Sequence, residues 1–489
     1  MQTFDFSIVR EIEKQTRRDW LKQCGGGCGW LALTGMLSGN QAALAEATRS
    51  LGPFAAKPPM MPAKAKNVIW IFMNGGPSQV DTWNYRPELA KRDGQPLEGF
   101  DPKTGFFPAE VGAIMKSPFE FKQHGESGTW GSELFPGLAQ HVDKMAFIHS
   151  CFSSSNNHSP ALFMMNTGVT RMGSPCVGSW VTYGLGSECE NLPAFIVMSD
   201  PLNRGLPKGS ASNWGAGFLP SIYQGTWLKP QGEPIDNLKP PGNLAGNPQR
   251  AQLDLLNQLN QHHARQSAVE SELAARIESF EMAYRMQTTA PEALEFSKEP
   301  ESIHALYGTD KKHCAHFAKQ CLLARRFVER GVRFVQIYSG GMENQQSWDG
   351  HIDLAGNHSG FAKEADQPIA ALLSDLAQSG LLESTLVICA GEFGRLPIAQ
   401  KGAKPGRDHN PHAFTAWLAG GGIKGGIHYG ETDDIGFKAV VDKVGVGDLH
   451  ATILAALGLD HEKLTFKFQG LDQRLTGVEH HRVIKEIFS

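Results

Sequence analysis

The heptapeptide NVIWIFM at residues 67–73, followed by NGGP at 74–77, decides the fold. The run is almost entirely apolar and lacks the alternation of a strand with one face in water. A continuous run of this length, bounded by glycine and proline, is typical of a central strand in a parallel sheet. The segment therefore predicts a buried strand that leads into a tight loop.

Strands and helices alternate along the rest of the chain. Apolar runs predict further strands at 145–149, 194–198, 333–338, 385–389 and 413–418. Helices are expected over 159–168, 314–330, 366–379 and 448–457. This alternation favours an α/β fold with a mostly parallel central sheet and helices on both faces.

Capping residues locate the starts of two of these helices. Ser159 is expected to be an N-cap with Pro160 at the first helical position, and that helix ends near Thr167-Gly168. Asp448 is expected to cap the helix that reaches Leu457.

The segment from about 250 to 290 does not alternate between predicted strands and helices. Leucine and other apolar residues recur there at helical spacing among charges, which predicts a helical insertion of one or two long amphipathic helices. The heptads do not persist, so a coiled coil is not expected. A lid, a dimer surface and simple packing all remain open roles for this insertion.

The bulk composition is that of an ordinary globular protein. The chain has 489 residues, a net charge of −4 and 41% hydrophobic residues, and no basic stripe favours nucleic acid binding. Six of the eight cysteines lie after residue 150. A disulfide, for example between Cys176 and Cys189, is possible in an oxidising compartment, but the sequence does not assign one.

The first 45 residues have the three parts of a twin-arginine signal peptide. TRRDWLK at 16–22 precedes a weakly apolar run at 24–37 and a small-x-small site at 43–45. The chain is therefore expected to be exported to the periplasm or cell surface, with a linker over 46–65 and one domain over 66–489. The apolar run is too short for a stable membrane span. An amphipathic helix with two chance arginines is the alternative.

Polar clusters follow the predicted strands, at the end of a parallel sheet where sites collect. Their members are Asn74 and Asp81, Asn157 and His158, Asp349 and His351, Glu392 and Arg395, and Arg407, Asp408, His409 and His412. Carboxylates with imidazoles are the ligand set of a divalent ion, here Zn, Mn, Mg or Ca. No other cofactor is indicated.

Each cluster also has a simpler structural interpretation. The Asp-x-His at 349–351 could be a surface pair, although an extended loop could aim both side chains at one centre. Glu392 could pair with Arg395 or Arg407, and Asp408 could make an Asx turn. His158 could simply end a helix.

The ordered motifs resemble a known bacterial family. GGPSQVDT at 75–82, Asn157-His158, WDGH at 348–351, GEFGR at 391–395 and GRDHNP at 406–411 look like "domain of unknown function 1501". That family is distantly similar to the alkaline phosphatase and sulfatase superfamily, whose members carry divalent ions at the ends of a parallel sheet. The resemblance implies an alkaline-phosphatase-like fold.

The superfamily places a nucleophile at a helix N-terminus, and the resemblance puts His158 at that position. Leu162 stands where sulfatases have an arginine. Asn74 replaces the usual aspartate after the first strand, and Glu392-Phe393 replaces an Asp-His pair. These departures leave the usual alkoxide nucleophile in doubt.

Our first hypothesis is an exported, metal-dependent hydrolase of phosphate or sulfate esters. Its metal ligands would be Asp349, His351, Glu392, Asp408 and His409. The side chains of Asn157 and His158 would face the ion, and Arg395 or Arg407 could clamp an anionic small-molecule or glycan ester. Further site candidates are Asn74, Asp81 and His412. A non-catalytic binding protein and a purely structural metal site are the alternatives, and the oligomeric state stays open.

Overall fold

The computed structural model describes residues 54–489 apart from 231–232, 236–237, 239–246, 267–270 and 343. The chain divides into two units, Met1–Ala55 and Ala56–Ser489. The predicted signal peptide lies outside the described residues. The second unit begins before the expected boundary at residue 66, since Lys57 N donates to Leu185 O and Met61 N donates to Gly458 O.

A nine-stranded sheet forms the centre of the second unit, in the order β14-β5-β13-β9-β1-β8-β6-β7, with β17 paired to β5. The strands are β1 (Asn67–Met73), β5 (Met145–Phe152), β6 (Phe195–Met198), β7 (Thr226–Leu228), β8 (Phe334–Ser339), β9 (Thr385–Ala390), β13 (Phe414–Ala419), β14 (Ile427–Tyr429) and β17 (Val444–Gly445). All pairings are parallel except those of β13. The predicted α/β class and mostly parallel sheet are confirmed.

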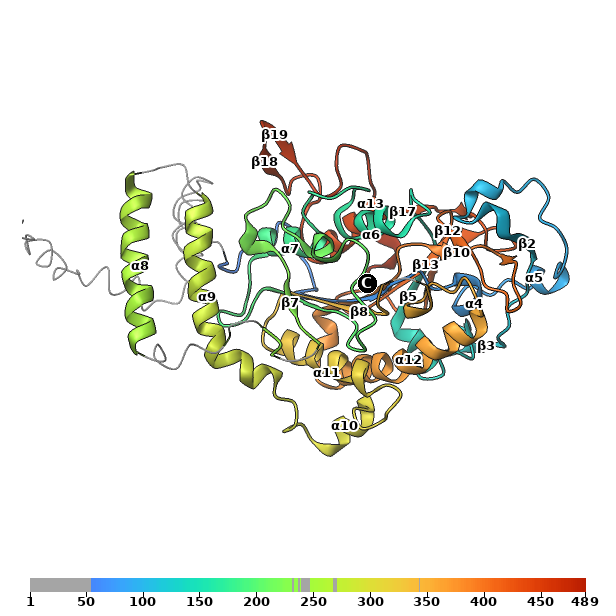
Figure 1. Ribbon diagram of the computed structural model, residues 1–489, viewed down its shortest axis with the longest axis horizontal. Helices are drawn as coiled ribbons and strands as arrows, with labels where there is room; N and C mark the ends of the chain where they lie inside the picture. The colour runs from blue at the N-terminus through green and yellow to red at the C-terminus, as the bar shows by residue number, and fades with distance from the viewer. Residues whose placement is uncertain (1–53, 231–232, 236–237, 239–246, 267–270, 343) are drawn as a thin grey trace, which may run out of the picture. The chain divides into compact units, whose positions relative to one another are not determined.

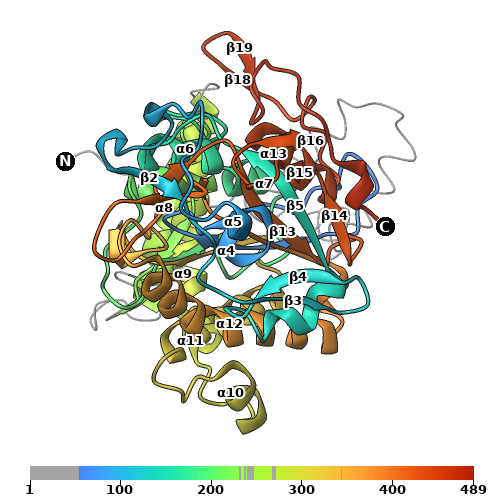
Figure 2. The same cartoon turned by 90° about the vertical axis from the view of Figure 1, so that its right-hand side faces the viewer.

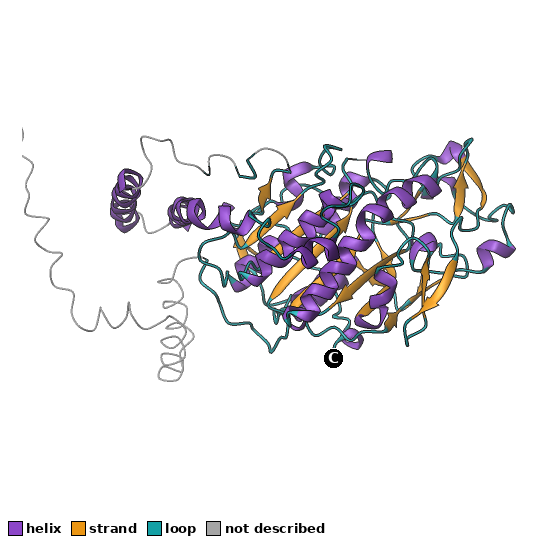
Figure 3. Ribbon diagram, turned by 90° about the horizontal axis from the view of Figure 1, so that it is seen from below, coloured by secondary structure: helices purple, strands orange, loops and turns teal. Residues whose placement is uncertain are grey.

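Helices cover both faces of the sheet (Figures 1 and 3). One face carries α6 (His158–Thr167), α7 (Val177–Leu185) and α13 (Val446–Ala456). The other face carries α11 (Ala315–Glu329) and α12 (Leu354–Gln378). Every residue of β1 is buried, because helices pack against both sides of this strand.

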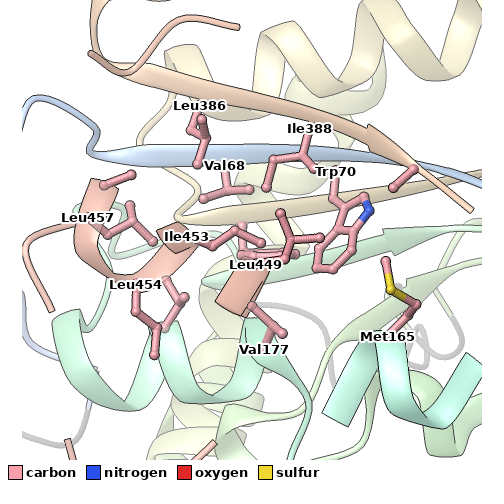
Figure 4. Close-up of a cluster of buried hydrophobic side chains, with 14 of the residues drawn as sticks. Val68, Trp70, Met165, Val177, Leu386, Ile388, Leu449, Ile453, Leu454 and Leu457 are labelled. Carbon is pink, nitrogen blue, oxygen red and sulfur yellow. The ribbon is translucent and has the colours of Figure 1, made fainter. Parts of the chain in front are cut away.

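Alternate residues of β1 point to opposite faces and pack against different helices. Val68 and Trp70 belong to a core cluster with Leu449 and Ile453 of α13 (Figure 4). Burying a side chain of this size is worth about 1.5–3 kcal/mol. This apolar packing fixes β1 in the middle of the sheet and so fixes where its carboxyl end opens.

Two predicted helix starts are wrong by a few residues. The N-cap of α6 is Asn157, whose side chain accepts a hydrogen bond from Ser159 N, so Ser159 and Pro160 lie inside the first turn. Asp448 is the third residue of α13, and its carboxylate accepts from Gly445 N. At α6 the neighbouring Asn157 takes the capping role, whereas at α13 Asp448 makes the capping hydrogen bond from inside the first turn.

Helix α12 begins twelve residues before its predicted start, because Asp353 caps it and Pro368 is accommodated within it. The predicted end of α6 is confirmed, since Gly168 adopts a left-handed φ of 78° as its C-cap.

The insertion consists of two helices, α8 (Asn247–Gln266) and α9 (Ser271–Leu294), which contact each other. Helix α9 also contacts α11. The remaining short helices are α4 (Gln79–Thr82), α5 (Glu88–Lys91) and α10 (Glu301–Tyr307).

Small two-stranded sheets form outside the central sheet. They pair β2 (Val111–Ile114) with β11 (Ile398–Gln400), β3 (Phe121–His124) with β4 (Thr129–Ser132), β10 (Gly394–Arg395) with β12 (His409–Asn410), β15 (Glu431–Thr432) with β16 (Ala439–Val441), and β18 (Phe466–Phe468) with β19 (Leu471–Gln473).

Cys176 and Cys189 are both free thiols, so the possible disulfide is not formed. The Cys176 Sγ atom lies 3.2 Å from Ser179 Oγ instead. None of the helices in the described part of the chain combines the length and apolar character needed to cross a membrane.

Candidate metal centre

The carboxyl ends of four strands meet at one edge of the sheet. β8 and β9 run parallel to β1, and β5 points the same way because β13 is antiparallel to both β5 and β9. The loops after these strands carry most of the polar residues that the sequence singled out.

Four side chains from these loops converge on one point. They are His158, Asp349, His351 and His409, and each offers a ligand atom within 4.8 Å of the others. All four are buried, with exposures between 1% and 7%. His158 comes from the first turn of α6 and His409 from β12, which the main-chain pairing with Arg395 in β10 holds in place.

The hydrogen bonds of the three histidines fix their tautomers. Each Nδ1 lies beside an oxygen: His158 beside Glu392 Oε1 at 2.6 Å, His351 beside Gln400 Oε1 at 2.7 Å, and His409 beside Asn156 O at 2.6 Å. These oxygens can only accept, so each Nδ1 carries a proton and donates it. In the neutral imidazoles the Nε2 lone pairs therefore face the centre of the cluster.

The Gln400 amide is oriented by a second contact. Its Nε2 donates to the Glu110 carboxylate, which cannot donate in return. The Gln400 oxygen must therefore face His351, so the tautomer of His351 does not depend on an arbitrary amide flip.

Two observations show that this centre fits a cation. His351 Nε2 and His409 Nε2 lie 2.9 Å apart, where two lone pairs would repel unless a positive charge lay between them. His158 Nε2 is buried and makes no hydrogen bond, although it lies 3.1 Å from Asp349 Oδ2. A divalent ion would satisfy all three nitrogens and the carboxylate, which are common zinc ligands.

Asp349 carries the negative charge of the cluster. Burial raises the pKa of this carboxyl, but the charges of Arg395 and His158 outweigh burial and hold the pKa well below its usual value. Its Oδ1 accepts from Arg395 Nη2 at 2.6 Å, and its Oδ2 accepts from Asn344 N at 2.7 Å. The carboxylate is therefore ionised and rigidly placed.

The pKa values of two histidines in the cluster are shifted in opposite directions. Burial lowers the pKa of His158, but Asp349 and Glu392 outweigh it and raise the pKa to about 9. Burial and the charge of His158 lower the pKa of His409 well below its usual value. Before any ion binds, a proton on His158 thus balances part of the acidic charge.

Glu392 and Asp408 lie behind the cluster. The Glu392 carboxylate accepts from His158 Nδ1 and from Gly75 N. The Asp408 carboxylate accepts from Phe107 N and from His409 N, and its Oδ1 atom lies 3.8 Å from His351 Nδ1. Both were predicted as metal ligands, but the structure places them behind the cluster, in contact with its histidines.

The two arginines are fully buried and engaged within the protein. Arg395 donates to Asp349 and to the carbonyl oxygens of Gly75 and Gly76. Arg407 forms an ion pair with Asp81, with Nε 2.6 Å from Oδ2. Neither guanidinium faces an open space in which it could clamp an anion, in contrast to the prediction.

The other candidates also lie outside the cluster. Asn74 donates from its side chain to the carbonyl oxygens of Gly341 and Met342. Asn157 caps α6, and His412 is exposed beside the Phe437 ring.

The loop after β1 requires glycine at position 75. Its φ is +103°, and a Cβ atom there would lie 2.6 Å from Asp349 N and Ser347 Oγ. The backbone of this loop therefore supports the segment that carries Asp349, and its N–H holds Glu392.

Three phenylalanines enclose the imidazoles. The rings of Phe106 and Phe393 lie 5.6 and 4.5 Å from His409, and Phe107 lies 4.9 Å from His351. Phe393 belongs to the GEFGR motif, but no sequence pattern indicated a role in the site for Phe106, Phe107, Gln400 or the main chain of Asn156. Their roles depend on contacts between distant segments.

Comparison with protein families gives one match, to the model described as "Protein of unknown function (DUF1501)", over residues 65–488. This is the family that the motifs indicated. A search of curated proteins finds no matching sequence.

Several solved structures are similar to the chain at low identity. The alkaline phosphatase from the Antarctic bacterium TAB5 is 9% identical with a TM-score of 0.32, covering 81% of this chain and 99% of the phosphatase. The lipoteichoic acid synthase LtaP from Listeria monocytogenes is 10% identical with a TM-score of 0.32, covering 89% and 80%. The phosphonate monoester hydrolase SpPMH from Silicibacter pomeroyi is 10% identical with a TM-score of 0.35, covering 86% and 76%.

Proposed function

Since this chain belongs to the family described as "Protein of unknown function (DUF1501)", its activity has to be inferred from its site, and we propose that it is a metal-dependent hydrolase of phosphate or sulfate esters. One observation carries the proposal: three imidazole Nε2 atoms and the Asp349 carboxylate converge at the carboxyl edge of a parallel sheet. The ester class follows from the sequence motifs, because the family that they resemble is distantly similar to the alkaline phosphatase and sulfatase superfamily.

The residues of the chain divide between holding and orienting the ion. His158, His351, His409 and Asp349 are the proposed ligands. Glu392, Gln400 and the Asn156 carbonyl fix the imidazole rings, as outer partners of metal-bound histidines usually do. A bound divalent ion would polarise an ester oxygen and acidify a water molecule.

Because Arg395 and Arg407 are bonded within the protein, the ion itself would supply the positive charge that an anionic ester needs. The proposed substrate is therefore a small-molecule or glycan ester that presents its anionic group to the ion. The identity of the ion is part of the test.

The test measures metal content and turnover on the same protein. Purified full-length chain is analysed for metals by mass spectrometry and assayed with aryl phosphate and aryl sulfate after loading with Zn, Mn, Mg or Ca. We expect a bound ion and turnover, and a fall in turnover of at least about 100-fold for His158→Ala. His412→Ala is the matched control, because His412 is exposed and lies outside the cluster. Absence of turnover with every ion would overturn the hydrolase proposal.

A second candidate is a non-catalytic protein whose ion only stabilises the loops. The observation that favours it is the number of protein ligands: structural zinc sites have four, whereas catalytic sites usually keep one position open. A tightly bound ion without turnover, together with a large loss of thermal stability on chelation, would identify this case.

We also propose that the chain is exported through the twin-arginine route, on the basis of residues 16–45. The test replaces Arg17 and Arg18 with lysine in the full-length chain and compares periplasmic and cytoplasmic fractions. We expect the double variant to remain in the cytoplasm at full length. Unchanged export of the variant would contradict the proposal.

A further inference from the structure

A pocket of about 500 Å³ lies outside the metal centre. In Figure 2, β5 and β14 lie side by side with β4 at their lower end, and the pocket is bounded by these strands and by residues 83–86. As far as the chain is described, its lining contains none of the four metal-centre side chains. Its volume is within the range of about 300–1,000 Å³ that small-molecule sites occupy.

The pocket contains a flat pair of imidazoles. His149 Nε2 and His428 Nδ1 are hydrogen-bonded at 2.9 Å, and their ring planes differ by only 5°. A hydrogen bond between ring nitrogens runs near the ring planes, so the two rings form one surface. Thr129 Oγ1 holds the other side of His428 at 2.8 Å.

Both imidazoles are neutral at ordinary pH. Burial, followed by the effects of His428 and Arg86, lowers the pKa of His149 to about 3. Burial also lowers the pKa of His428. The surface therefore offers flat rings without a charge.

The indole ring of Trp130 adds a second flat surface to the lining, beside that of the imidazole pair. Trp130 is 38% exposed, although it packs on Tyr85 with ring centroids 4.4 Å apart. Tyr85 is supported in turn by Phe121 at 5.0 Å. A rigid, partly exposed aromatic ring of this kind provides a large contact area at a low entropic cost.

The lining of the pocket carries charges of both signs, so it offers both hydrogen-bond donors and acceptors. Arg86 supplies a guanidinium donor to the lining. Burial lowers the pKa of Arg86, and the carboxylates of Glu431, Asp433 and Asp434 oppose that shift, so several acids surround this single arginine. Glu431 and Asp442 also line the pocket and would repel an anion.

We propose that this pocket, the aromatic pocket, binds a neutral saccharide. A sugar ring has an apolar face that packs on flat rings such as Trp130 and the imidazole pair. Its hydroxyl groups donate to the carboxylates of Glu431 and Asp442 and accept from Arg86. The proposal does not depend on the metal centre or on hydrolysis.

The test uses the full-length chain on a glycan array of neutral, sulfated and amino oligosaccharides, followed by calorimetric titration of the best neutral ligand. We expect binding to a neutral oligosaccharide and quenching of tryptophan fluorescence. Trp130→Ala should weaken binding by at least about tenfold, since the variant loses both the stacked aromatic contact and the apolar area that it buries. Phe280→Ala, which removes an exposed ring elsewhere, should bind as the wild type does.

A second variant tests the pocket independently, in case Trp130→Ala fails to fold. Val441→Trp starts from an exposed position in the lining and should fill the pocket without disturbing the core. Loss of binding in both pocket variants, with unchanged circular dichroism, supports the proposal. No neutral ligand on the array, a preference for sulfated or amino sugars, or binding that both variants retain would overturn it.

Discussion

His351 Nε2 and His409 Nε2 face each other at 2.9 Å, and each ring donates its Nδ1 proton to a protein oxygen. The two lone pairs cannot satisfy each other, so this arrangement is stable only with a cation or an extra proton between them. The fold therefore holds these two nitrogens close together at an energetic cost that a bound cation would remove.

The first prediction is that chelation destabilises the protein. An ion that binds only the folded state adds about 4 kcal/mol at a concentration 1,000 times its dissociation constant. We expect EDTA to lower the melting temperature measured by calorimetry, and His409→Ala to abolish this sensitivity. His412→Ala should keep it. Equal melting temperatures with and without EDTA in the wild type would contradict the prediction.

The second prediction concerns Gln400, which contacts His351 Nδ1 but lies outside the ligand cluster. Loss of an outer partner typically weakens metal binding by about 10–100-fold, because the ring loses its orientation. We expect Gln400→Ala to show this loss in competition with a fluorescent chelator. Gln378→Ala, at the exposed end of α12, serves as the control, and equal affinities of the two variants would rule out the orienting role.

The third prediction concerns the Asp81–Arg407 ion pair, in which both side chains are fully buried. Removing one member leaves an uncompensated buried charge, at a cost of about 3–5 kcal/mol in the free energy of unfolding. We expect Asp81→Ala to show this loss in urea denaturation. The exposed Lys404–Asp353 pair is the comparison, and Lys404→Ala should cost much less than Asp81→Ala because water screens the exposed pair. Similar losses at both pairs would refute the burial argument.

The strands of the core could be predicted from sequence because each is a short, continuous apolar run. β1 has the predicted bounds, and β8 and β9 are displaced by at most one residue at each end. The antiparallel direction of β13 could not be predicted, since it depends on which distant strands pair with it. Short strands such as β14 and β17 have too few residues to show a pattern.

The site could be predicted in part for a similar reason. Asp349, His351 and His409 follow strands that end at one edge, and the structure brings them together. The sequence did not distinguish ligands from the carboxylates behind them, because Glu392 and Asp408 have the same chemistry and neighbouring positions. That distinction depends on side-chain direction, which only the packed loops determine.

The fourth prediction is that two histidines outside the metal centre make the fold sensitive to acid. Burial lowers the pKa of His149 to about 3 and that of His450 to about 4, from an ordinary value of 6.5. A depressed pKa means that the fold prefers the neutral ring. The stability that each ring contributes is complete above pH 6.5 and is lost as the pH falls toward the folded-state pKa.

Between pH 7 and pH 5 the expected loss is about 2 kcal/mol for each of these rings, since the unfolded chain takes up a proton that the folded chain refuses. The measurement compares urea denaturation of the wild type with that of His149→Gln, so that the contributions of all other titrating groups cancel. The variant should lose about 2 kcal/mol less over the same interval. His480→Gln, which changes an exposed ring, should follow the wild type. If His149→Gln instead kept the full pH dependence, the neutral state assigned to His149 would be incorrect, and with it the uncharged surface of the aromatic pocket.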